Sequence, residues 1–252
     1  LFSLQTTDRS IDRFSRVNGL NETGISSIAY DPATEKLLIA YNNSNIDILH
    51  RLDVFNIPDL KRDNIIGDKT IYHIYPLNGL FYLSTGLGIV VADGSRYEIK
   101  DSWFIGNNGN QVKVTGFTSD GSFYYAATAE GLKRAAINGP NPANYINWQL
   151  ISGTNGLPAG SVQQVVAVQN KIILLKNDSL YVQSGNNWSF LYRDGWNINS
   201  MNIAENRILL CERQGNTGRV QVLQPDGTVF RSTPAAIGSL PMQALLFGNE
   251  TW

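Results

Sequence analysis

Two histidines and one cysteine are the side chains of this sequence best suited to nucleophilic or general-base chemistry. They are His50, His73 and Cys211. A catalytic triad needs a histidine or a well-placed substitute beside its nucleophile. Zinc sites need several His or Cys ligands at close spacing. The three residues are far apart and form no pair at that spacing, so we expect no metal site, no cofactor and no catalytic histidine. We interpret both histidines as hydrogen-bonded structural residues.

Carboxylates are the second group that could do chemistry, because glycosidases work with pairs of them. Asp31 precedes a proline, and Asp120 and Asp226 each precede a glycine. In such turns an Asp side chain usually accepts hydrogen bonds from its own backbone, and we predict that role here. The sequence also has no phosphate-binding loop, EF-hand loop or dinucleotide fingerprint. These observations predict a protein that is not an enzyme.

The elements that would position these residues come from a repeated unit. A pair of apolar residues three apart recurs about every 43 residues, a period typical of the blades of a β-propeller. The pairs are Ile25/Ile28, Ile71/Ile74, Val114/Phe117, Val162/Val165, Ile198/Met201 and Met242/Leu245. We interpret each pair as the innermost strand of a blade, and we expect the second members to lie at a common depth.

Three further segments follow each pair and complete a four-stranded antiparallel blade. The second segment is a continuous apolar run, such as residues 37–41 or 172–175, as expected for a strand buried on both faces. A short turn leads to the third strand, at whose end His50 falls. The fourth segment often carries an aromatic residue that we expect to pack between blades. These aromatics are Phe14, Trp103, Trp148 and Trp188.

The pattern predicts an all-β fold with five whole blades and two half-blades. Residues 1–15 are typical of the third and fourth strands of a blade, and residues 242–252 of a first strand and the start of a second. If the halves close together the propeller has six blades; if each belongs to a separate blade it has seven. An open sheet would leave strand edges exposed. We expect residues 1–252 to form a single β-propeller domain of a longer chain.

Composition excludes some partners. The net charge is −1, so no electrostatic footprint for nucleic acid is present. No apolar stretch is long enough to span a membrane. The lone Cys211 forms no disulfide within the chain, which fits both a reduced cytosol and a secreted fold with a large core.

One mouth of the central channel of such a propeller is the candidate binding site. Amides, a carboxylate and tyrosines there would suit a carbohydrate or a polar lipid head group. The candidates are Tyr30, Tyr41, Asn42, Asn43, Asn45 and Asp47. The alternative is a hairpin turn that these Asn residues stabilise among themselves.

The segment from Arg13 to Leu49 is more specific than the general repeat. It reads RFSRVNGLNETGISSIAYDPATEKLLIAYNNSNIDIL. It resembles the N-terminal propeller of PorZ-like proteins of the bacterial type IX secretion system. More loosely, it is similar to the two-component regulator propeller repeats of periplasmic sensor kinases. The close likeness covers about 40 residues, and the rest of the chain follows by its repeat period.

The resemblance implies a non-catalytic, extracytoplasmic scaffold or binding domain at the bacterial cell surface or in the periplasm. It implies seven blades in the parent propeller, and work alongside a sortase that attaches cargo to lipopolysaccharide. The alternative is the sensor propeller of a hybrid two-component regulator that binds an oligosaccharide. A third alternative, a propeller lyase or glycosidase, requires acidic or His residues that converge on one channel mouth.

Overall fold

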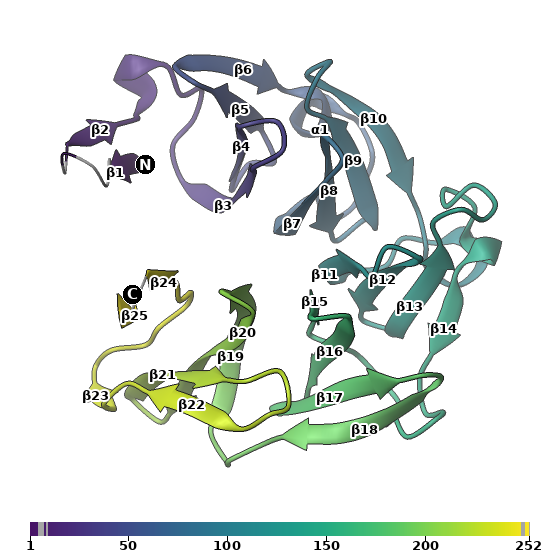
Figure 1. Ribbon diagram of the computed structural model, residues 1–252. Coiled ribbons are helices and arrows are strands. Elements are labelled where there is room, and N and C mark those ends of the chain that lie inside the picture. The colour runs from purple at the N-terminus through teal and green to yellow at the C-terminus, as the bar shows by residue number, and fades with distance from the viewer. Residues whose placement is uncertain (5–7, 9, 248–249, 252) are drawn as a thin grey trace. The chain divides into compact units, whose positions relative to one another are not determined.

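The computed structural model describes residues 1–4, 8, 10–247 and 250–251, and these are almost entirely β-strand and turn (Figure 1). The chain divides into two compact units. The first comprises Leu1–Val114 with Ala143–Tyr145, and the second comprises Thr115–Pro142 with Ile146–Trp252. The expectation that residues 1–252 form one domain stays a prediction. No helix in the described part of the chain is long and apolar enough to cross a membrane.

The first unit contains a two-stranded sheet and two four-stranded antiparallel sheets. The small sheet pairs β1 (Phe2–Leu4) with β2 (Ile11–Arg13). Blade 1 is β3 (Ile25–Asp31), β4 (Lys36–Tyr41), β5 (Ile46–His50) and β6 (Asp53–Ile57); blade 2 is β7 (Ile71–Leu77), β8 (Leu80–Thr85), β9 (Ile89–Asp93) and β10 (Glu98–Trp103). Three short helices connect these strands: one at Arg16–Asn18 after β2, α1 (Asp59–Arg62) after β6, and one at Asn107–Gly109 after β10.

The second unit contains three further sheets of the same order. Blade 3 is β11 (Val114–Ser119), β12 (Phe123–Thr128), β13 (Gly131–Ala136) and β14 (Gln149–Ile151), with a short helix at Tyr145–Asn147; blade 4 is β15 (Gln164–Val168), β16 (Lys171–Lys176), β17 (Ser179–Ser184) and β18 (Asn187–Tyr192); blade 5 is β19 (Asn197–Ala204), β20 (Arg207–Gln214), β21 (Thr217–Leu223) and β22 (Val229–Ser232). An extra strand, β23 (Ala236–Ile237), pairs with β21 in blade 5, and β24 (Leu246–Phe247) pairs with β25 (Glu250–Thr251). The predicted five whole blades and two half-blades are confirmed.

A β-bulge explains why the apolar pairs of β3, β7 and β19 are three residues apart. Side chains of a regular strand share a face at every second residue, and one bulged residue lengthens that interval to three. The register shifts between Ile71 and His73 in β7, and between the corresponding residues of β3 and β19. Beyond the bulge, Ile74 pairs with Leu83 of β8. Both members of a pair therefore point to the same side of the blade.

The apolar faces of consecutive blades pack against each other within each unit. One buried cluster joins Leu38 and Ile48 of blade 1 to Ile71 and Ile74 of blade 2. Equivalent clusters join blade 3 to blade 4 and blade 4 to blade 5. The inner pair of each of these blades therefore lies against the blade that precedes it. Burial of this kind stabilises by about 25 cal/mol per Å² of apolar surface.

Of the aromatic residues assigned to fourth strands, Trp103, Trp148 and Trp188 are buried and Phe14 is half-buried. Trp188 belongs to the cluster between blades 3 and 4, and Phe14 packs on the cluster at the outer side of blade 1. Both confirm the predicted packing between sheets. Phe14 follows β2 and Trp148 precedes β14, so these two lie next to the strands rather than within them.

The ends of the chain depart from the repeat. Ile74, Phe117, Val165 and Met201 are at most 5 % exposed, whereas Ile28 is 44 % exposed. The expected common depth therefore fails for Ile28, because what precedes blade 1 in its unit is the two-stranded β1–β2 sheet rather than a whole blade. The sixth pair, Met242/Leu245, was expected in a first strand, but both residues are exposed and precede β24.

Candidate functional site

The six predicted binding residues separate into an exposed and a buried group. Tyr30, Asn42 and Asn43 are exposed, with Tyr30 at 54 %. Tyr41, Asn45 and Asp47 are buried, and Asp47 has no exposed surface. The turn between β4 and β5 holds Asn42 and Asn43, and Asn43 Oδ1 accepts a hydrogen bond from the Asn45 backbone N–H (3.1 Å). A ligand-binding role for these residues stays a prediction.

Asp47 is the centre of a hydrogen-bond network inside blade 1. Its carboxylate accepts bonds from the backbone N–H (2.9 Å) and the side chain (2.8 Å) of Asn21, and from Asn56 Nδ2 (2.8 Å). The hydroxyl of Tyr41 donates a further bond to Oδ2 (2.5 Å), and burial beside this carboxylate raises the pKa of Tyr41. The carboxylate thus holds the segment entering blade 1 onto β4, β5 and β6.

The two histidines lie where the repeat predicts them. His50 ends β5, and His73 lies within β7. Desolvation lowers the pKa of His73 to about 4, so its ring is neutral at physiological pH. Nδ1 of His73 is buried without a hydrogen-bond partner among the described residues. The interpretation of both histidines as hydrogen-bonded structural residues stays a prediction.

The three turn aspartates bond to their own turns, as predicted. Asp31 accepts bonds from Ala33 N (3.1 Å) and Thr34 Oγ1 (2.7 Å). Asp226 accepts bonds from the backbone N–H (2.9 Å) and hydroxyl (2.7 Å) of Thr228. Carboxylates engaged in this way are structural in these turns.

Metal ligation and thiol chemistry find little support in the described part of the chain. No group of three or more His, Cys, Asp or Glu side chains lies within ligating distance of one another there. Cys211 is fully buried in β20, and desolvation raises the pKa of its thiol. A thiol in that environment is inert, because the reactive form is the exposed thiolate.

An ionic cluster around the buried Glu212 of blade 5 was missed by the sequence analysis. Arg219 of β21 donates from Nε to Glu212 Oε2 on β20 (2.7 Å), and its Nη2 bonds to Asp194 in the loop between β18 and β19. The ring of Trp196 lies 4.2 Å from the guanidinium carbon. Glu212 is fully buried, and burial raises the pKa of its carboxyl to about 7. No local motif marks this cluster, because Glu212 and Arg219 meet through strand register and Asp194 joins them from a loop.

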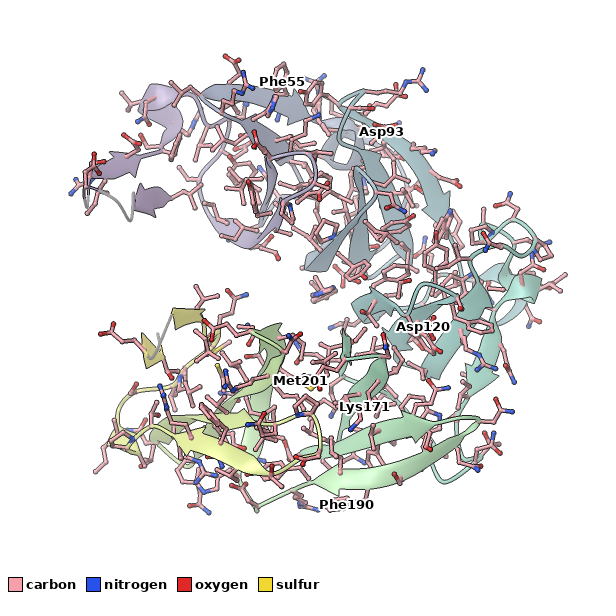
Figure 2. The ribbon with its side chains drawn as sticks, viewed as in Figure 1. Phe55, Asp93, Asp120, Lys171, Phe190 and Met201 are labelled. Atoms are coloured by element: carbon pink, nitrogen blue, oxygen red, sulfur yellow. The ribbon has the colours of Figure 1, made fainter. Side chains whose placement is uncertain are left out.

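A polar cleft of about 350 Å³ lies between blades 3 and 4 in the second unit. Its floor includes Phe123 and the buried residues Tyr125 and Ile172, which are 1 % and 3 % exposed. Turns supply its rim: Asp120 between β11 and β12, where Figure 2 labels it, and Asn170 between β15 and β16. Sequence alone marked the Asp120 turn but not the neighbouring turns that complete the cleft.

The Asp120 turn fixes one wall of this cleft. Asp120 Oδ1 accepts bonds from the backbone N–H groups of Ser122 (2.8 Å) and Phe123 (2.7 Å), and Oδ2 accepts one from the Tyr125 hydroxyl (2.8 Å). Burial, together with this carboxylate, raises the pKa of Tyr125 to about 12. The phenol therefore stays protonated and continues to donate to Asp120.

Antiparallel four-stranded blades that pack face to face define the chain as a β-propeller protein. Its residues 1–149 match the family model described as the TSS9, PorZ, N-terminal beta-propeller domain. The chain belongs to this family. No protein of curated function matches the sequence significantly.

Solved structures share the fold. The chain is similar to PorZ of Porphyromonas gingivalis, described as an essential bacterial surface component of the type IX secretion system, with 22 % identity, a TM-score of 0.80, and coverage of 99 % of this chain and 32 % of that chain. It is also similar to the extracellular domain of a putative one-component system from B. thetaiotaomicron, with 15 % identity, a TM-score of 0.70, and coverage of 96 % and 36 %. The extracellular domain of a putative hybrid two-component system from the same bacterium is similar too, with 12 % identity, a TM-score of 0.62, and coverage of 84 % of this chain and 28 % of that chain. The chain thus spans about a third of these proteins.

Proposed function

We propose that this propeller is a non-catalytic, extracytoplasmic scaffold that supports sortase-linked attachment of cargo proteins to lipopolysaccharide at the bacterial surface. The observation that carries the proposal is the PorZ family match over residues 1–149. The hydrogen bonding of the carboxylates supports the proposal. The side chains that accept hydrogen bonds from neighbouring residues are those of Asp31, Asp47, Asp120 and Asp226. A scaffold needs such rigid turns, whereas a glycosidase needs a free acid and a free base.

The partners follow from the same proposal. A protein of the attachment machinery, such as the sortase, would bind one surface of the propeller, and lipopolysaccharide or another glycan would bind a second. The location is the cell surface or the periplasm, as the descriptions of the similar proteins suggest for those proteins. Neither a cofactor nor nucleic acid takes part.

Binding of the purified chain to lipopolysaccharide, to a glycan panel and to the sortase of the same organism tests the proposal. We expect retention of lipopolysaccharide or of the sortase on the immobilised chain. Absence of both, with the chain folded by circular dichroism, would overturn it.

A second function is favoured by the likeness to extracellular sensor domains. In that case the propeller senses an oligosaccharide for a two-component regulator. Binding of a free oligosaccharide, without either lipopolysaccharide or sortase, would support this alternative. The full-length gene gives an independent answer: a transmembrane helix and a kinase indicate the sensor, and a second propeller with a sorting domain indicates the scaffold.

A further inference from the structure

The cleft between blades 3 and 4 has the size of a small-molecule site, and its lining is mostly polar over a small apolar base. Ligand sites are concave, with apolar floors and a few placed polar groups, and they begin at about 300 Å³. This cleft of about 350 Å³ has Phe123, Tyr125 and Ile172 at its base. Its rim carries the side-chain amides of Asn170 and Asn186. An apolar base with polar groups above it suits a flat ligand that has one less polar face.

Charge decides which class of polar ligand fits. The charged side chains that line the cleft are Arg134 and Asp120, whose opposite charges leave the lining with no net charge. The Asp120 oxygens already accept three bonds, and the Arg134 guanidinium lies 4.6 Å from the Phe123 ring centre while its Nη2 donates to Gln149 (2.7 Å). An anionic ligand would therefore meet a single cation next to a carboxylate, and a cationic ligand would meet an arginine. A neutral ligand pays neither penalty.

Amide side chains set the hydrogen-bonding requirement. Each amide offers one carbonyl acceptor and two N–H donors, and the guanidinium offers further donors. Gln183 also lines the cleft, and its Nε2 is held by the carbonyl of Gly185 (3.0 Å), so its amide is fixed in orientation. Neighbouring hydroxyl groups, each both donor and acceptor, match this mixture of groups. A pyranose ring supplies such hydroxyls on its edge and C–H groups on its face.

We propose that the cleft between blades 3 and 4 binds one neutral pyranose unit of a glycan. The proposal rests on the proposed function for the source of that glycan, which is the saccharide part of lipopolysaccharide. The amides of Asn170, Gln183 and Asn186 bond the ring hydroxyls, and Arg134 donates from beside Phe123. Asp120 does not touch the sugar; it is a positioning residue that holds the turn and Tyr125.

The test uses the purified chain with methyl glycosides of glucose, galactose, mannose and N-acetylglucosamine as probes, measured by saturation-transfer NMR and calorimetry. Asn186→Trp fills the exposed rim of the cleft, and Arg134→Ala removes its cation. Loss of such contacts should weaken binding of the preferred glycoside by about tenfold or more. Arg207→Ala is the matched control, because the Arg207 guanidinium also lies over a phenylalanine ring (Phe230, 3.9 Å) but outside the cleft.

The outcomes separate this inference from the proposed function. Equal glycoside binding by the parent chain, Asn186→Trp and Arg134→Ala, or no glycoside binding at all, would overturn the cleft proposal. Retention of lipopolysaccharide by the same variants would then leave the proposed function standing. Glycoside binding that the cleft variants abolish, without any retention of lipopolysaccharide or sortase, would support the cleft and refute the proposed function. Should Arg134→Ala fail to fold, Asn186→Trp alone decides.

Discussion

Glu212 and Arg219 are cross-strand partners in β20 and β21, and the carboxylate of Glu212 has no exposed surface. One oxygen, Oε2, accepts from Arg219, whereas Oε1 is buried without a hydrogen-bond partner among the described residues. Asp194 shares the same guanidinium, and Tyr192 lies close enough for its pKa to be raised by burial and by both carboxylates. A single arginine therefore serves two acids, and burial disfavours the charged form of the inner one.

The pH dependence of stability should follow from Glu212. Its pKa is raised from 4.5 to about 7 in the folded chain, so the folded state holds this proton more tightly than the unfolded state. The stabilisation that the protonated Glu212 carboxyl contributes is fully present below pH 4.5 and is lost as the pH rises from there through 7. The loss is on the order of 3 kcal/mol. Urea unfolding of Glu212→Gln from pH 5 to pH 8 should lack this loss.

Glu205→Gln is the control for this prediction, because Glu205 is an exposed carboxylate of the same blade. It should keep the pH profile of the parent chain. Identical profiles for the parent chain and Glu212→Gln would show that Glu212 titrates at its ordinary value.

Asp47→Ala should destabilise the first unit strongly. The substitution leaves the side chains of Asn21, Tyr41 and Asn56 without their shared acceptor inside blade 1. The buried Tyr41 hydroxyl would lose its acceptor at a cost of about 1–3 kcal/mol. The hydrogen bonds that Asn21 and Asn56 donate to the carboxylate would be lost as well, so we expect a loss of about 2 kcal/mol or more in urea unfolding. Asp53→Ala, at an exposed position of the same blade, should change stability by about 0.5 kcal/mol or less. Similar losses for both would mean that the network contributes nothing specific.

Leu38→Ala and Leu174→Ala should each lower stability by about 2–5 kcal/mol, because each leaves a cavity between two packed blades. Both side chains are fully buried, Leu38 between blades 1 and 2 and Leu174 between blades 3 and 4. Leu52, which is 82 % exposed, provides the control substitution. Thermal melts in which Leu38→Ala and Leu174→Ala behave like Leu52→Ala would contradict the stacked arrangement.

Gly156→Ala should destabilise the link into blade 4. Gly156 has φ +85°, and a Cβ there would collide with the carbonyl oxygen of Trp188, whose N–H donates to Asn155 (2.7 Å). Gly185 also has a positive φ, but no described atom lies within 4 Å of its Cβ position. Gly185→Ala should therefore cost about 1–2 kcal/mol for its backbone conformation alone, and Gly156→Ala clearly more. Calorimetric melting temperatures would compare the two, and equal losses would argue against the collision.

His50→Ala and His73→Ala should leave binding to lipopolysaccharide or the sortase unchanged while the chain remains folded. His73 is a neutral ring in β7, and His50 lies at the end of β5, so neither is placed to transfer a proton. The retention assay of the proposed function measures this directly. Loss of retention in a folded variant would reopen the enzymatic alternative.

Local signals in the sequence were enough to predict the blades. Apolar runs identify strands because successive side chains of a strand point to opposite faces. Asp-Gly and Asn-rich segments identify the turns between them. The spacing of Ile71 and Ile74 was visible in the sequence, but only the register of β7 and β8 showed the bulge that causes it. The turn roles of Asp31 and Asp226 were equally local, since their partners lie within three residues.

Tertiary structure alone decided what lies between strands that are distant in sequence. Asp47 received its donors from Asn21 and Asn56, Glu212 met Arg219 and Asp194, and the cleft formed where turns of blades 3 and 4 adjoin. Burial is the physical reason: whether a carboxylate is solvated, saturated with donors or held near neutral depends on what packs over it. A one-dimensional pattern specifies which face of a strand is apolar, but not which side chain of another strand meets it there.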